Sequence, residues 1–155
     1  MRKTLYILLL PFAFLSCTNK EEEIEREAGR MLDEARTLMA GKDYQAARDS
    51  ILVMRQNFPT AFNARAAGII VMDSIELLES QDSLAVMDTI LQDEKAILAQ
   101  LEFEKRRGHN AEFYKQRTKV FHLQQQFDEM EAKVKFYLRK IEVDIQENKV
   151  KNISK

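Results

Sequence analysis

The chain has 155 residues, of which 45% are hydrophobic and 32% are charged, enough apolar material for a core and too much for wholesale disorder. Lysine and arginine total 24 and aspartate and glutamate total 25, so the net charge of -1 offers no electrostatic basis for nucleic-acid binding. Four glycines and two prolines predict an all-α fold. One cysteine and two histidines exclude a disulfide framework and leave little material for a metal site.

The N-terminus has the pattern of a secretory signal. Arg2 and Lys3 precede an apolar run over residues 5–15, which is shorter than the roughly 20 residues of a permanent transmembrane helix. The run ends at Leu15-Ser16-Cys17, and acidic, hydrophilic residues follow. We therefore expect a signal peptide over residues 1–16, with cleavage just before the cysteine.

A cysteine in this place resembles the signal of bacterial lipoproteins, although Phe14 and Leu15 depart from the commoner motif. The resemblance implies that a diacylglyceryl group is linked to Cys17, which makes the membrane the first predicted partner. Several acyl chains hold a protein stably at a bilayer, whereas one chain holds it only marginally. An ordinary secretory signal followed by a free, buried cysteine is the alternative.

Residues 17–24 are expected to form a lipidated acidic tether. No aspartate follows Cys17 directly, which by the same resemblance favours the outer membrane over the inner membrane. The run from Lys20 to Glu23 resembles an acidic surface-export signal of some Gram-negative lipoproteins, but it also suits a solvated helix start. The periplasmic face and the cell surface both stay open.

Residues 25–80 are predicted to form tetratricopeptide-like helices. Apolar residues at steps of three and four predict a first helix over residues 24–39, which ends where Gly41 adopts a left-handed conformation. Asp43 is expected to cap a second helix that ends at Asn57-Phe58-Pro59. The apolar positions of this pair resemble one 34-residue tetratricopeptide repeat. They are Ala28, Met31, Ala35, Leu38, Tyr44, Ala47, Ile51, Met54 and Pro59. A further helix over residues 60–78 and a new helix from Gln81 are expected to follow.

Residues 81–150 are predicted to form a long antiparallel helical hairpin that resembles a coiled coil. Leu84, Leu91 and Leu98 recur every seven residues, as apolar seam positions of a coiled coil do. Asn110 is expected to cap the second helix, which repeats the same spacing at Phe113, Val120, Phe127, Val134 and Ile141. A tight loop around Gly108 makes the two helices antiparallel neighbours. Residues 151–155 are expected to fray.

The sequence carries no pattern that indicates catalysis or a cofactor. The glycines are isolated, so no phosphate-binding loop is present, and the carboxylate runs lack the glycine-containing calcium loop. His109 and His122 have no partner at ligand spacing along the chain. We therefore predict a protein that is not an enzyme and takes no cofactor, metal or small-molecule substrate.

Four triplets place an aspartate, a hydroxyl residue and an aliphatic residue in order. They resemble an O-glycosylation acceptor pattern of one group of Gram-negative bacteria, and their hydroxyl residues are Ser50, Ser74, Ser83 and Thr89. Helix capping beside core aliphatic residues is the alternative, above all at Asp82, where a helix start is expected.

These patterns together favour a lipid-anchored, non-catalytic protein-interaction or scaffold module of the cell envelope, with an unidentified protein partner. The exposed residues expected to contact it are Arg36, Lys42, Gln45, Arg106, Arg107 and His109. The alternative is a periplasmic holdase or adaptor that clasps unfolded envelope proteins through methionine and phenylalanine side chains. Such a clasp requires an exposed apolar stripe along the hairpin, so burial of Phe113, Val120 and Phe127 against the leucines disfavours it. A hydrolase has the least support.

Overall fold

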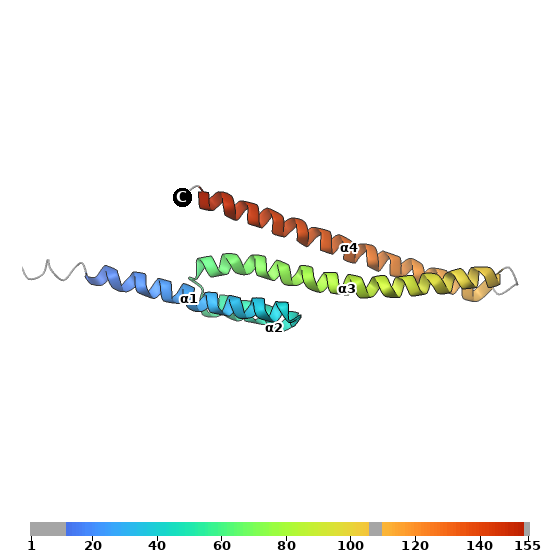
Figure 1. The fold of residues 1–155 in the computed structure, drawn as a ribbon, viewed down its shortest axis with the longest axis horizontal. Coiled ribbons are helices and arrows are strands. Elements are labelled where there is room, and N and C mark those ends of the chain that lie inside the picture. Colours follow the sequence, from blue (N-terminus) through green and yellow to red (C-terminus); the bar gives the residue numbers. More distant parts are fainter. Residues whose placement is uncertain (1–11, 106–109, 154–155) are drawn as a thin grey trace, which may run out of the picture. The chain divides into compact units, whose positions relative to one another are not determined.

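The computed structural model describes residues 12–105 and 110–153, and within these ranges every element is a helix (Figure 1). In chain order they are α1 (Phe12–Ala40), α2 (Tyr44–Asn57), α3 (Phe62–Lys105) and α4 (Asn110–Ile153). The predicted all-α class is confirmed. None of the described helices is both long and apolar enough to cross a bilayer.

The chain divides into two compact units inside α3, between Ile75 and Glu76. The N-terminal unit contains α1, α2 and the first part of α3, and the C-terminal unit contains the rest of α3 and α4. The boundary that the sequence suggested, between residues 80 and 81, also lies inside α3.

A Schellman motif ends α1, and its left-handed residue is Lys42 rather than Gly41. Lys42 has a φ of 63°, and its N–H donates to the carbonyl oxygen of Met39 at 3.0 Å. The N–H of Asp43 donates to the carbonyl oxygen of Leu38, also at 3.0 Å. These two bonds define the motif and satisfy carbonyls that a helix end leaves free. The prediction that Gly41 adopts the left-handed conformation is therefore wrong by one position.

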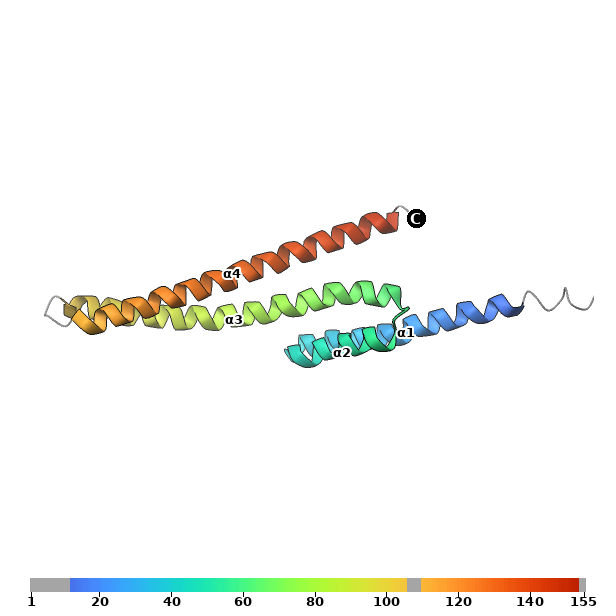
Figure 2. The same cartoon turned by 180° about the vertical axis from the view of Figure 1, so that it is seen from behind.

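The predicted ends of α2 are confirmed. The side chain of Asp43 accepts a hydrogen bond from the N–H of Ala46 at 3.2 Å, as an N-cap does. The helix ends at Asn57, and the N–H of Phe58 donates to the carbonyl oxygen of Met54. In both views α1 and α2 lie side by side and run in opposite directions (Figures 1 and 2). The sequence therefore contains a helical hairpin before Pro59.

Three helical segments enclose the core of the N-terminal unit. Its fully buried members include Ala28 from α1, Ile51 and Met54 from α2, and Ile75 from α3. Gly68 makes a close approach possible, because a Cβ there would lie 3.1 Å from Cε of Met54. The start of α3 therefore completes the core that the first two helices begin.

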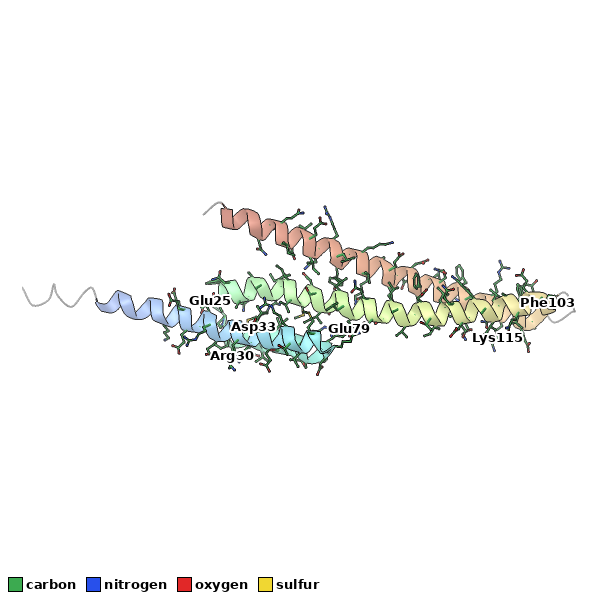
Figure 3. The ribbon with its side chains drawn as sticks, viewed as in Figure 1. Glu25, Arg30, Asp33, Glu79, Phe103 and Lys115 are labelled. Atoms are coloured by element: carbon green, nitrogen blue, oxygen red, sulfur yellow. The ribbon has the colours of Figure 1, made fainter. Side chains whose placement is uncertain are left out.

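Glu25 joins α1 to the first turn of α3 (Figure 3). Its Oε1 accepts from the N–H of Asn63 at 3.0 Å, and its Oε2 accepts from the N–H of Ala64 at 3.1 Å. Ala61 precedes the helix and has no side-chain acceptor, so a carboxylate distant in sequence serves as the cap.

The predicted break near residue 80 is wrong, because α3 continues through it for 44 residues in total. The segment from Leu78 to Leu84 contains no glycine or proline that would end a helix. The Ser80 hydroxyl donates to the carbonyl oxygen of Glu76 at 2.6 Å within the same helix. Asp82 is therefore a mid-helix residue, and the capping explanation for its triplet fails.

The C-terminal unit is an antiparallel hairpin of α3 and α4 with a packed heptad seam. Leu91 is 1% exposed, Phe113 is 7% exposed, and Val120 and Val134 are each 9% exposed. Leu84, Leu98 and Phe127 are half-buried. Helix α4 runs from Asn110 to Ile153 and so extends through part of the segment that was expected to fray. The residues just before Asn110 lie outside the described ones, so its role as a cap stays a prediction. Residues 154–155 lie outside the described residues.

Candidate interaction surfaces

The predicted lipidation residue, Cys17, falls within the bounds of α1, but its side chain lies outside the described residues. The tether continues into the exposed carboxylates of Glu21, Glu22 and Glu23 on the same helix. The segment after the cysteine is therefore helical rather than extended.

Three of the predicted contact residues lie at the exposed end of the α1–α2 hairpin. Arg36 is ion-paired with Asp33 at 2.6 Å, and Gln45 donates to Oδ1 of Asp49 at 2.9 Å. Lys42 is exposed at the left-handed turn position. The remaining three, Arg106, Arg107 and His109, lie outside the described residues.

The four candidate glycosylation residues differ in the accessibility of their hydroxyls. Ser50 on α2 is half-buried and donates to the carbonyl oxygen of Met31 on α1 at 3.2 Å. Ser74 is half-buried and donates to the carbonyl oxygen of Ile70 at 2.7 Å. Ser83 and Thr89 are exposed, and the Thr89 hydroxyl donates to the carbonyl oxygen of Ala85 at 3.1 Å.

A polar layer interrupts the apolar seam of the C-terminal unit. Glu94 on α3 accepts from Nε2 of Gln116 at 2.6 Å and from Nζ of Lys119 at 2.6 Å, both on α4. Nε2 of Gln116 also contacts the carbonyl oxygen of Glu94 at 3.0 Å. The Gln116 hydrogen bond is the main cause that holds the pKa of Glu94 below its ordinary value. The Lys119 hydrogen bond adds to it, and burial opposes both.

The sequence contains a signal for this layer, which is a charged residue in the heptad seam. Glu94 lies seven residues after Met87 and seven before Leu101, so it occupies a seam position. A charged residue at such a position selects a helix register by requiring a polar partner. Gln116 supplies that partner three residues after Phe113.

An open hollow of the N-terminal unit was also missed. It is lined by Arg55, Arg65, Ala66 and Ile69. Arg65 donates from Nη1 to the carbonyl oxygen of Arg55 at 2.7 Å, which ties the first turn of α3 to the last turn of α2. Sequence periodicity could not separate these residues from the core, because α3 is apolar on several faces along its length.

Two further hollows lie in the C-terminal unit. One is lined by Met87 on α3 and by Gln126, Glu129, Met130 and Lys133 on α4. The other lies on α4 alone, where Tyr114, Arg117, Thr118 and Phe121 surround it.

Among the residues with a described placement, no group of three or more His, Cys, Asp or Glu side chains is arranged to hold a metal ion. Searches against protein-family models, curated proteins and solved structures gave no significant match.

Proposed function

We propose that this protein is a lipid-anchored interaction module of the bacterial cell envelope, held to the outer membrane through Cys17. The observation that carries the proposal is the apolar run that ends at Leu15-Ser16-Cys17 and the hydrophilic stretch that begins directly after the cysteine. The anchor would attach to the N-terminal end of α1, and the two helical units would supply surfaces for a protein partner. The N-terminal unit would act as a tetratricopeptide-like module.

Packing in the hairpin supports a scaffold over a clasp. A holdase would present the seam side chains to unfolded clients, but Phe113 and Val120 are buried and Phe127 is half-buried within the C-terminal unit. Opening the seam would expose these side chains to water at a cost of about 1.5–3 kcal/mol for each one. The apolar residues that stay exposed, such as Ile90 and Phe121, lie outside the seam.

Substitution of Cys17 tests the anchor. In Cys17→Ser the thiol that would carry the lipid is absent, so the chain should move from the membrane fraction to the soluble fraction and lose the mass of the acyl groups. Ser16→Ala is the matched control, because a small residue before the cysteine is kept. A Cys17→Ser chain that stays in the membrane fraction with unchanged mass would contradict the proposal.

Protease treatment of intact cells tests the side of the membrane. Loss of the chain while a periplasmic marker survives would place it on the cell surface, and protection would place it in the periplasm. Cells that were not treated with protease give the intact mass, which reports sugar at Ser83 or Thr89. A mass equal to polypeptide plus lipid would exclude glycosylation at all four triplets.

A further inference from the structure

The hollow between α2 and α3 joins positive charge to exposed apolar side chains. Ile69 in its lining is 46% exposed. Leu52 lies three residues before Arg55 on α2 and is 54% exposed, and Phe62 lies three residues before Arg65 on α3 and is 73% exposed, so helix spacing places both next to the lining. A single exposed apolar residue is ordinary, but several beside one hollow indicate a contact surface. We call Leu52, Arg55, Arg65 and Ile69 the arginine hollow.

The two guanidinium groups of the arginine hollow lack a carboxylate partner within the described part of the chain. The hydrogen bond of Arg65 goes to a carbonyl oxygen, and no ion pair involves Arg55 or Arg65 there. A guanidinium has five N–H donors and binds a carboxylate with two of them at once. The hollow therefore suits an acidic side chain that projects from an apolar surface.

The C-terminal unit has a surface of that chemistry on α3. Val86 is 62% exposed, Ile90 is 42% exposed and Ile97 is 43% exposed. Spacings of four and seven residues place them along one side of the helix. Asp93 lies between the two isoleucines, is exposed, and has no ion pair or hydrogen bond to any other described residue. We call these four residues the acidic stripe.

We propose that the arginine hollow of one copy binds the acidic stripe of a second copy of this chain. In this contact the carboxylate of Asp93 pairs with the guanidinium of Arg55. Ile90 and Ile97 pack against Leu52 and Ile69, which removes apolar surface from water on both copies. The complementary charges select the pairing, since an arginine hollow repels a second arginine hollow.

The contact is head-to-tail, because the two surfaces that meet are different. A head-to-tail contact leaves one free surface on each end copy, so the copies can extend into a row or a ring. The inference also rests on the proposed function in one respect. A lipid on Cys17 would confine the copies to one membrane plane and raise their effective concentration.

Paired charge reversals in the full chain test this contact. Two copies with different affinity tags are produced in the same cells, and recovery of the second tag with the first is measured after mild detergent extraction. Arg55→Glu in both copies, or Asp93→Arg in both copies, should each lower this recovery by about fivefold or more. The chain that carries both substitutions should return to within about twofold of the natural chain.

Arg117→Glu is the matched control, because Arg117 is an exposed arginine of α4 outside both surfaces. Its recovery should equal that of the natural chain. Circular dichroism checks that each variant is folded.

Three outcomes overturn the proposal. The first is that two natural copies are not recovered together. The second is that the single reversals leave the recovery unchanged, and the third is that the double reversal fails to restore the recovery. The first outcome would apply if the hollow binds an acidic helix of a different protein. Whether the chain is found in the membrane fraction or in the soluble fraction reports the lipid anchor separately. Copies that pair in the soluble fraction would therefore refute the anchor and leave the contact between copies intact.

Discussion

The two units of this protein use antiparallel helices in different ways. In the N-terminal unit three segments surround a core in which Ala28, Ala35, Ala47 and Ala61 are fully buried. Small side chains allow the helices to approach closely, and Ile51 and Met54 fill the space between them. In the C-terminal unit two helices share one seam, and its leucines at 84 and 98 stay half-exposed.

This difference explains why a polar layer lies within the seam of the second hairpin. Two helices cannot enclose their apolar side chains completely, so hydrophobic burial specifies their register weakly. The layer of Glu94, Gln116 and Lys119 specifies it instead, because a shift of α4 by one heptad that brings Leu123 to the place of Gln116 would leave Glu94 opposite an apolar residue. The comparison predicts that truncation of a buried apolar side chain lowers the free energy of unfolding most in the N-terminal unit.

The largest expected effect is the loss of a core side chain in the N-terminal unit. Ile51→Ala should lower the free energy of unfolding by about 3–4 kcal/mol, since Ile51 is fully buried and leaves a cavity. Leu91→Ala in the seam should cost less, about 2–3 kcal/mol, because side chains at a two-helix contact can move into the space. Urea unfolding measures both changes.

Leu52→Ala is the control for Ile51→Ala. Leu52 is the next residue of α2 and is 54% exposed, so its loss should change the free energy of unfolding by only about 0.5 kcal/mol. An effect of Leu91→Ala larger than that of Ile51→Ala would reverse the comparison between the units.

The second expected effect concerns the cap that Glu25 provides to α3. Glu25→Ala leaves the N–H groups of Asn63 and Ala64 without their acceptor and should cost about 1–2 kcal/mol. Thermal unfolding followed by circular dichroism measures the change. Glu22→Ala removes an exposed carboxylate of the same helix and should have little effect.

The third expected effect is a gain in stability at the α1–α2 turn. Lys42→Gly relieves a left-handed conformation that costs an L-residue about 1–2 kcal/mol, although glycine also loses more chain entropy on folding. The net gain should be about 0.5–1 kcal/mol. Lys42→Ala keeps the strained backbone and should show no gain in the same urea experiment. A gain in Lys42→Ala would place the effect in the lysine side chain.

The sequence predicted features that depend on local chemistry. The cap at Asp43 and the end of α2 before Pro59 follow from a few neighbouring residues, and the heptad seam follows from a regular spacing along each helix. Helix continuity through Asp82 was missed because a polar serine–aspartate stretch favours a cap only when the helix stops nearby.

Contacts between distant residues could not be read from local patterns. Glu25 lies 38 residues from Asn63, and nothing in either neighbourhood indicates that they meet. The arginine hollow depends on which faces of α2 and α3 are left uncovered. Exposed and buried apolar residues alternate too closely along α3 for periodicity to separate them.

The smallest expected effect is a pH dependence of the seam that comes from Glu94. The Gln116 hydrogen bond, with help from Lys119, lowers the pKa of Glu94 in the folded chain below its ordinary value. A carboxyl with a lowered folded pKa adds stability at pH values above its ordinary pKa, and this stability is lost as the pH falls through the folded pKa. The natural chain should therefore lose more thermal stability between neutral pH and about pH 3 than Glu94→Gln does.

Glutamine keeps the size of the side chain but cannot ionise, so the difference between the two Tm profiles isolates this carboxyl. Glu129→Gln, at an exposed position of α4, should follow the natural chain. Identical profiles for Glu94→Gln and the natural chain would mean that the polar layer sets the register through geometry alone, without a contribution from charge.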